Sequence, residues 1–352
     1  MAKQSQFSND EYTIGWICAL RDEFTVATTM FTKEHGLPQS LPAEDNGAYM
    51  LGEIGQHKVV MACFPAGRMG TTPAAVAADG LRRTFKSVRF GLLVGIGGAV
   101  PHPHAGKDVR LGDVVVSVPT AQYGGVVQYD FGKVESGGSF KHLGHLCSPP
   151  EKLLATVTLL QSLTERLRDP ATYIQDSLAE LERQSDTHRY PTIGDNLFQP
   201  DYIHGSDRAH GSVTVMPGTS NQAGTSRNDC SNCNRSRLVT DRRRRPNNNP
   251  VIHLGTIASG NAVIKDTRHR DHIDQQYNNT ILCFEMEAAG LMNTFPCLVI
   301  RGISDYADSH KNDGWRSRAI ATSSAYAKAL ITIMRPADVV SLPNVDAAMR
   351  RR

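Results

Sequence analysis

Short apolar runs rich in valine and isoleucine alternate along the chain with longer segments of helical periodicity. Because apolar residues are continuous within these runs, the runs are typical of β-strands that are covered on both faces. Strands are expected at residues 12–20, 57–64, 89–100, 113–117, 251–259, 281–286 and 297–304. Helices are expected at residues 22–33, 72–85, 151–167, 171–185, 287–294 and 315–334. This alternation predicts the α/β fold class.

Residues 187–250 depart from this order, because they are polar and rich in glycine, serine, asparagine and aspartate. A stretch of this length without periodicity is either a functional insertion or disordered. Strand-like sequence resumes at Val251 as if the sheet were being completed. We therefore expect one domain over residues 12–334, with a polar insertion at about 187–250. Residues 1–11 and the basic residues 335–352 are predicted to be flexible.

The composition is that of an ordinary globular protein, with 352 residues of which 40% are hydrophobic and 21% are charged. A net charge of +3 is too small to argue by itself for binding to nucleic acid or membranes. No apolar segment reaches the roughly 20 residues of a membrane helix, and the N-terminus lacks the apolar core of a signal peptide. These features predict a cytoplasmic protein, with a nuclear location still open.

Most of the seven cysteines lie in apolar runs and are expected to be reduced core residues. Cys230 and Cys233 have the C-x-x-C spacing that makes half of a zinc site. A full site needs two more ligands, for which the sequence offers scattered candidates such as His204 and His253. We therefore predict no metal, and Cys230 and Cys233 are the residues to examine for one.

The last expected strand carries a charge, in the stretch VIRGISDYAD at residues 299–308. Burying the guanidinium of Arg301 costs several kcal/mol unless it is paired and hydrogen-bonded, so an acidic partner is expected. Asp305 ends the same strand, where open α/β sheets collect their ligands. The alternative role for Asp305 is a helix cap, but the residues that follow are a poor helix start. We predict a functional role for Asp305.

Glycines and acidic residues mark other strand ends. The stretch VGIGGAV does not complete a dinucleotide-binding G-x-G-x-x-G motif, because Val100 stands where a glycine is needed. Gly97 and Gly98 permit either a tight turn or close approach of the backbone to a sugar or an anion. Glu23 follows the first expected strand and Glu287 follows the sixth, and in both places a favourable interaction with a helix dipole is an alternative to function.

The chain resembles the nucleoside phosphorylase/nucleosidase superfamily, of the purine and uridine phosphorylase type, in the stretches IGWICALRDEF, PAGRMGTT, LLVGIGGAV, RLGDVVVS, IASGNAVI, CFEMEAAGLMN and VIRGISDYAD. The resemblance covers roughly residues 12–145 and 250–334. Its site pattern is nearest to methylthioadenosine nucleosidases, within a fungal branch often fused to receptor-like proteins. It implies a three-layer α/β/α sandwich around a mixed, partly barrel-like central sheet, a homo-oligomer (a dimer or a trimer of dimers), and no cofactor.

The resemblance also implies cleavage of the N-glycosidic bond of a purine nucleoside by phosphate or water. An oxocarbenium-like transition state with an anionic leaving base needs an acid, a carboxylate near the sugar and a positioned nucleophile. Asp305 matches the acid that protonates the purine, and Glu287 matches the residue that binds the ribose hydroxyls. Glu23 matches the glutamate that activates water in methylthioadenosine nucleosidases.

Further positions match substrate contacts of the family. Met286 packs on the sugar, and the backbone of Ile264 pairs with the purine edge. Val263 replaces an aromatic ring that sandwiches the base, so base stacking is expected either to be weaker or to come from another residue such as Tyr129 or Phe131.

Charged residues complete the expected site. Arg301, paired with an acidic neighbour such as Glu285, is predicted to support the sugar-binding segment. Arg68, Lys265, Arg268 and the arginines at 242–245 are candidates for receiving a 5′-phosphate chain of an adenine nucleotide, ATP included.

The nucleophile is predicted to be water. Two positions that bind phosphate in phosphorylases are here Leu93 and Ile96, neither of which can bind an oxyanion. Arg21 lies near a helix N-terminus and could still hold phosphate. One alternative is therefore a phosphate-dependent nucleoside phosphorylase. The other, which follows from the fusion to receptor-like proteins in this branch, is a non-catalytic nucleotide-sensing module.

Overall fold

The computed structural model describes residues 4–103, 106–138, 140–166, 172–205, 230 and 232–351. Its strands are β1 (Ile14–Cys18), β2 (Lys33–Gly36), β3 (Ala48–Ile54), β4 (His57–Cys63), β5 (Phe90–Ala99), β6 (Val114–Ser117), β7 (Val126–Gln128), β8 (Gly132–Val134), β9 (Phe140–His142), β10 (Ile252–Ser259), β11 (Ile281–Glu285) and β12 (Cys297–Asp305). Its α-helices are α1 (Arg21–Thr28), α2 (Thr71–Thr84), α3 (Glu151–Arg166), α4 (Thr172–Gln184), α5 (Thr267–Gln276), α6 (Arg316–Ile333), α7 (Pro336–Ser341) and α8 (Val345–Met349). Short 3₁₀ turns are η1 (Asn9–Glu11), η3 (Asp186–His188), η5 (Arg235–Arg237) and η6 (Ala288–Gly290).

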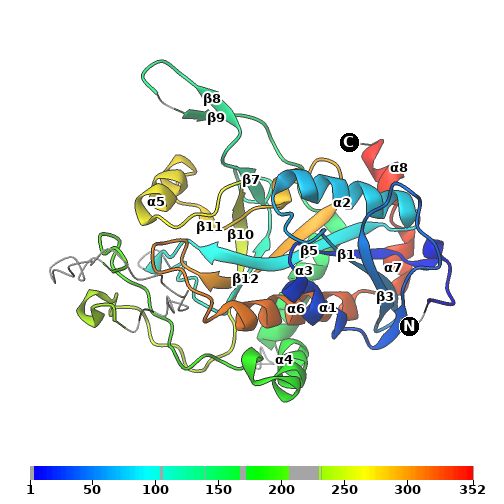
Figure 1. Ribbon diagram of the computed structural model, residues 1–352, viewed down its shortest axis with the longest axis horizontal. Helices are drawn as coiled ribbons and strands as arrows, with labels where there is room; N and C mark the ends of the chain where they lie inside the picture. The colour runs from blue at the N-terminus through cyan, green and yellow to red at the C-terminus, as the bar shows by residue number, and fades with distance from the viewer. Residues whose placement is uncertain are drawn as a thin grey trace, which may run out of the picture.

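The central sheet is mixed and closes partly on itself (Figure 1). The first half of β5 pairs in parallel with β1, and its second half pairs antiparallel with β11. Since β12, β6 and β10 connect β5 back to β11, these strands form a barrel-like ring from which β1, β4, β3 and β2 extend. The point where β5 exchanges one neighbour for another is a place where α/β sheets form ligand crevices.

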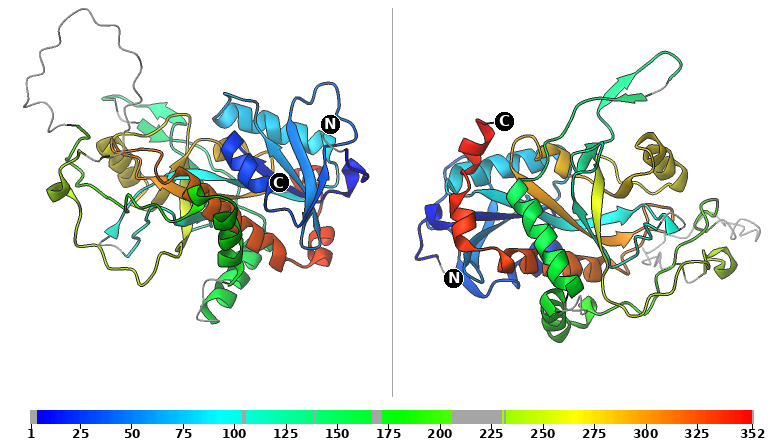
Figure 2. Two further views of the ribbon diagram at one scale, coloured as in Figure 1. Left: turned by 60° about the horizontal axis from the view of Figure 1, so that its bottom comes forward. Right: turned by 180° about the vertical axis from the view of Figure 1, so that it is seen from behind.

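Helices cover both faces of this sheet, as the fold class predicts. Helix α6 packs on β12 and β5, and α1, α3 and α4 contact α6 (Figure 2). On the other face, α2 contacts β4 and the turn η6. The hairpin of β8 and β9 stands out from the body of the domain (Figure 1).

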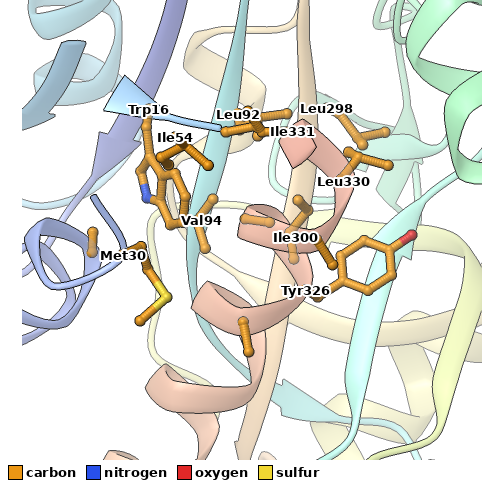
Figure 3. Close-up of a cluster of buried hydrophobic side chains, with 14 of the residues drawn as sticks. Trp16, Met30, Ile54, Leu92, Val94, Leu298, Ile300, Tyr326, Leu330 and Ile331 are labelled. Carbon is orange, nitrogen blue, oxygen red and sulfur yellow. The ribbon is translucent and has the colours of Figure 1, made fainter. Parts of the chain in front are cut away.

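Two cores explain why the strands are apolar without interruption. Trp16, Leu92 and Ile300 point to the α6 side, where Tyr326 and Leu330 meet them (Figure 3). The alternating residues of the same strands, including Ile17, Leu93 and Val299, belong to the core under α2. Because consecutive side chains of a strand point to opposite faces, burial of both faces requires apolar residues at every position.

All expected strands are present, and the differences lie in elements with weak patterns. The elements that were not predicted are β2, β3, β7, β8, β9, α5, α7 and α8. Helix α5, for example, buries only Arg270, Ile273 and Asp274. The helix expected at 287–294 is wrong, because the structure has only the short turn η6 there. The chain turns at this point because the carboxylate of Glu285 accepts the N–H of Ala288.

Residues near both ends of the chain contact the domain. In the C-terminal part, α8 buries Val345 and is joined to α2 by an ion pair between Arg82 and Asp346 (2.5 Å). In the N-terminal part, the N–H of Ser5 donates to the carbonyl of Leu37 (2.8 Å). No helix in the described part of the chain is both long and apolar enough to cross a membrane.

The arginine run at 242–245 fastens the insertion to the domain. Arg242 contacts Asp108 (2.8 Å) and Asp195 (3.1 Å), and Arg245 contacts Asp113 (2.5 Å). The interpretation of Arg242 and Arg245 as free charges for a substrate phosphate is therefore wrong, since carboxylates of the domain pair with both. The middle of the predicted insertion, residues 206–229, lies outside the described residues.

Candidate active site

A cavity of about 250 Å³ lies where β1, β5, β11 and β12 end. Its lining includes Glu23, Glu287 and Asp305, which are far apart in sequence yet surround one space. Each of these carboxyl side chains belongs to a buried residue. Buried acidic groups are costly unless neighbours satisfy them, so the contacts of each one determine what the cavity can do.

Glu23 lies in the first turn of α1 and joins that helix to β5. Its carboxylate accepts N–H bonds from Ala19 (3.1 Å), Leu20 (3.0 Å) and Ile96 (3.0 Å). Burial raises the pKa of Glu23, while the Arg301 guanidinium and the three N–H donors oppose that shift. A carboxyl group held in this way has a fixed orientation and a pKa closer to neutrality, as a general base requires.

Arg301 supports the acidic segment that follows β11. Its Nη2 donates to Glu285 and, at 3.2 Å, to Glu287. Glu285 also accepts the N–H groups of Glu287 and Ala288, each at 3.1 Å. Arg301 is 1% exposed, and the two glutamates replace the water that its Nη2 would otherwise need, whereas its Nε has no partner among the described residues. The structure thus pairs Arg301 with the neighbour named from the sequence.

Glu287 also lines the cavity, and its carboxylate accepts fewer hydrogen bonds than that of Glu285. Besides Arg301, its carboxylate accepts a long bond of 3.4 Å from the N–H of Gly70. Burial raises the pKa of the Glu287 carboxyl, Arg301 opposes the shift, and the neighbouring Glu285 adds to it. Spare acceptor capacity at a cavity wall suits a residue that binds sugar hydroxyls.

A β-bulge turns two consecutive residues of β12 toward the cavity. The pairing of β12 with β5 shifts between Ile303 and Asp305, so Ser304 is an extra residue. Neighbouring residues of a regular strand would point to opposite faces, whereas Ser304 and Asp305 both line the cavity. Gly98 leaves room for this arrangement, because a Cβ at position 98 would lie 2.7 Å from Oδ1 of Asp305.

The carboxylate of Asp305 is held by three donors. Ser304 Oγ (2.7 Å) and Lys311 Nζ (2.6 Å) approach Oδ2, and the N–H of Ala307 (2.9 Å) donates to Oδ1. Lys311 is about one-third exposed, so it connects the buried acid to the mouth of the cavity. Asp305 is therefore rigidly positioned with a cationic proton donor in direct contact.

The aromatic ring of the cavity is not one that the sequence suggested. Val263 and Ile264 line the cavity as expected, and the ring beside them is Phe284. Tyr129 packs edge-on against Phe284 at 5.4 Å between ring centroids, and Phe131 is exposed and lines another hollow. Stacking by Tyr129 or Phe131 is therefore replaced by Phe284 as the candidate for contact with a base.

The other predicted contacts divide into two groups. Met286, Gly97 and Gly98 line the cavity. Arg68 and Lys265 are exposed and do not belong to its lining.

Sequence reasoning missed two cationic residues of the lining, Lys311 and Arg316. Lys311 follows Asp305 by six positions, in a loop without periodicity. Arg316 is the first residue of α6 and lies 3.6 Å from Asp22, in the first turn of α1. A cation at a helix N-terminus opposes the helix dipole, and this unfavourable placement was the signal that could have identified Arg316.

The positions that bind phosphate in phosphorylases offer nothing for an oxyanion here. Leu93 is fully buried, and the N–H of Ile96 is already donated to Glu23. Arg21 is 90% exposed on its side chain and pairs with Asp22 (3.1 Å), outside the cavity lining.

Metal-binding side chains gather elsewhere, in the insertion and the loop after β12. His204, Cys233 and His310 approach one another there. His253, the other candidate from sequence, is instead bonded to Asp113 (2.9 Å).

Comparison with known proteins identifies a family and a relative. Residues 13–335 match the sequence model of the phosphorylase superfamily. A curated nucleotide-binding leucine-rich repeat (NLR)-like protein of Hyaloscypha variabilis is 40% identical over 335 residues. That match covers 95% of this chain and 30% of the relative, so the chain spans less than a third of that protein.

Solved structures with the same fold are nucleosidases and hydrolases by name. The 5′-methylthioadenosine/S-adenosylhomocysteine nucleosidase of Neisseria meningitidis, in complex with methylthio-immucillin-A, is 15% identical with a TM-score of 0.53, covering 92% of this chain and 99% of that one. Futalosine hydrolase of Helicobacter pylori is 15% identical with a TM-score of 0.53, and the match covers 93% of this chain and 100% of that one. The MTA/SAH nucleosidase of Streptococcus pneumoniae, in complex with 8-aminoadenine, is 16% identical with a TM-score of 0.53, and the match covers 92% of this chain and 100% of that one. At these identities the likeness shows the fold.

Proposed function

The chain belongs to the phosphorylase superfamily, a superfamily of enzymes, and on this premise we propose that it hydrolyses the N-glycosidic bond of an adenine nucleoside or nucleotide. The observation that carries the proposal is the convergence of Glu23, Glu287 and Asp305 on one cavity. Solved relatives of the same fold bind methylthio-immucillin-A and 8-aminoadenine, which supports an adenine-containing substrate.

Asp305 acts on the leaving base. As the glycosidic bond breaks, negative charge develops on the purine, and a proton delivered to a ring nitrogen neutralises it. Asp305 lines the cavity and contacts Lys311, whose ammonium lies 2.6 Å from Oδ2. Lys311 holds the acid in position and can return a proton to it after the base leaves.

Glu287 and Glu23 act on the sugar and on water. The carboxylate of Glu287 accepts hydrogen bonds from the ribose hydroxyls, and its negative charge stabilises the developing oxocarbenium ion. Glu23 removes a proton from the water that attacks the anomeric carbon. Its orientation is set by Ala19, Leu20 and Ile96, so little reorganisation is needed when the water binds.

Arg316 supports a nucleotide as the substrate. Of the cations on the lining, Arg301 is bound to two glutamates and Lys311 to Asp305, whereas Arg316 has a looser contact of 3.6 Å with Asp22. A guanidinium at the cavity wall is suited to a 5′-phosphate.

Replacing Arg316 by glutamine is expected to raise KM for AMP by about 10- to 100-fold, which is the loss of one charged hydrogen bond of about 1.5–3 kcal/mol. Adenosine, which has no phosphate, should be cleaved at nearly the original KM. The control is Arg68→Gln, since Arg68 is exposed and outside the lining. Equal loss for AMP and adenosine would remove Arg316 from phosphate binding.

The activity is expected to fall as the pH is lowered. The midpoint of this fall should lie above pH 4.5, the ordinary pKa of a glutamate. Burial raises the pKa of Glu23 and of Glu287, and both residues act in the ionised form. Lowering the pH through these raised values protonates them and removes the base and the sugar acceptor. A pH profile of kcat/KM measures this limb, and a profile that stays flat down to pH 4.5 would contradict the assignment.

The proposal is tested by incubating the protein with adenosine, methylthioadenosine, AMP and ATP, with and without phosphate, and measuring free adenine by chromatography. Adenine release in the absence of phosphate is expected from at least one of them. Release that depends strictly on phosphate would make the protein a phosphorylase.

A nucleotide-sensing role is the second candidate, because the matched relative is an NLR-like protein of which this chain spans 30%. Nucleotide binding measured by calorimetry, without adenine release from any of the four compounds, would favour that role.

A further inference from the structure

Two cysteines of the insertion meet two histidines that are distant in sequence. Cys233 Sγ lies 3.2 Å and Cys230 Sγ 3.6 Å from Nδ1 of His204. Ligand atoms of His204, Cys233 and His310 all lie within 4.8 Å of one another. In a tetrahedral zinc site with bonds of about 2.0–2.3 Å, the ligand atoms are roughly 3.3–3.8 Å apart. The two Sγ–Nδ1 distances therefore match this spacing to within 0.1 Å.

The side chain of His310 is buried in a way that calls for a ligand. It is 6% exposed and stacks on Phe198 (4.1 Å) and Tyr202 (5.2 Å). Its Nε2 has no hydrogen-bond partner among the described residues, although a buried polar nitrogen without a partner is costly. The carboxylate of Asp308 lies 3.9 Å from the other ring nitrogen, on the side where metal-bound histidines usually find an acceptor.

We propose that Cys230, Cys233, His204 and His310 bind one zinc ion. Two thiolates and two imidazoles are the ligand types that select zinc over calcium or magnesium, and a set of four protein ligands is typical of a structural site. The C-x-x-C turn is already formed, since the N–H of Cys233 donates to the carbonyl of Cys230 (3.1 Å). Both cysteines are free thiols in the structure.

The ion would fasten the insertion to the loop that follows β12. The N–H of His204 already donates to Ser309 Oγ (3.0 Å), and His310 immediately precedes Lys311. Lys311 is the residue that contacts Asp305 in the cavity. Zinc at His310 therefore fixes the loop next to this lysine, and the site exists independently of the proposed hydrolysis.

The test is the zinc content of the full chain. The protein is purified without chelators or a histidine tag, and its zinc is measured by inductively coupled plasma mass spectrometry. About one zinc per chain is expected for the wild type, and less than a tenth of that for Cys233→Ser and for His310→Ala. The matched control is Cys147→Ser, which removes a free cysteine outside the cluster and should keep the zinc. Equal zinc in Cys147→Ser and Cys233→Ser would overturn the assignment.

Two further measurements do not depend on whether Cys233→Ser and His310→Ala fold. Reduced, zinc-free wild type titrated with Co²⁺ should develop the visible absorption of a tetrahedral cobalt–thiolate site at one equivalent. A chelator should lower the Tm of the wild type and of Cys147→Ser by several degrees. Wild-type protein that contains no zinc and gives no cobalt–thiolate absorption would overturn the proposal, as would a disulfide between Cys230 and Cys233 in protein purified under reducing conditions.

Discussion

Replacing Asp305 by asparagine is expected to lower the rate of base release by about 10²- to 10⁴-fold, the usual contribution of a general acid. Asparagine has the same shape, and its carbonyl oxygen can still accept the N–H of Ala307. Its amide group has no proton to give at neutral pH. Lys311 loses its partner, but a side chain that is one-third exposed can turn to water. Activity should therefore be lost while the Tm changes little.

The control for this variant is Asp338→Asn, because Asp338 is a surface carboxylate paired with Arg335 and Lys152. Its turnover should equal that of the wild type. If Asp305→Asn also turned over at the original rate with a folded protein, Asp305 would have no role in protonating the base.

Replacing Glu23 by glutamine is the second large effect, with an expected loss of about 10²- to 10⁴-fold in kcat and a smaller change in KM. Glutamine cannot take a proton from water. It also turns an N–H group toward one of the backbone donors that the carboxylate accepted, at a cost of about 1–3 kcal/mol in the free energy of unfolding. Kinetics and thermal unfolding of the same sample separate the two consequences.

Asp22→Asn is the matched control, since Asp22 lies in the same helical turn but is half exposed and pairs with Arg21. A purely structural role for the first turn of α1 predicts similar losses in both variants. A general-base role for Glu23 predicts instead that only Glu23→Gln loses hydrolysis and that the acid limb of its pH profile disappears. Similar kcat values in the two variants would contradict that role.

The parts of the fold that were predictable from sequence are those with both faces buried. Trp16 and Ile17 enter different cores, so β1 could only be apolar throughout, and the same holds for β5 and β12. Helix α5 escaped prediction because it presents charged and polar residues on most of its surface. Homo-oligomerisation and a cytoplasmic location stay predictions.

The site was predictable where residues follow strand ends and not where loops set the contact. Glu23, Glu287 and Asp305 follow or end core strands, so motif and position agree. Lys311 reaches Asp305 through a loop in which Ala307 has a positive φ of 50°. The hydrophobic pattern of the sequence does not predict such a conformation. Of the four proposed zinc ligands, Cys230, Cys233 and His204 were candidates from the sequence, whereas His310 was missed because it meets Cys230 across 80 positions.

The central claim is that three carboxyl groups around one cavity direct water to the anomeric carbon. The most direct test is to identify the sugar product by mass spectrometry after adenine release from the preferred substrate, with excess phosphate present. We predict the free sugar or its 5′-phosphate, with no 1-phosphate. A sugar 1-phosphate as the main product would contradict hydrolysis.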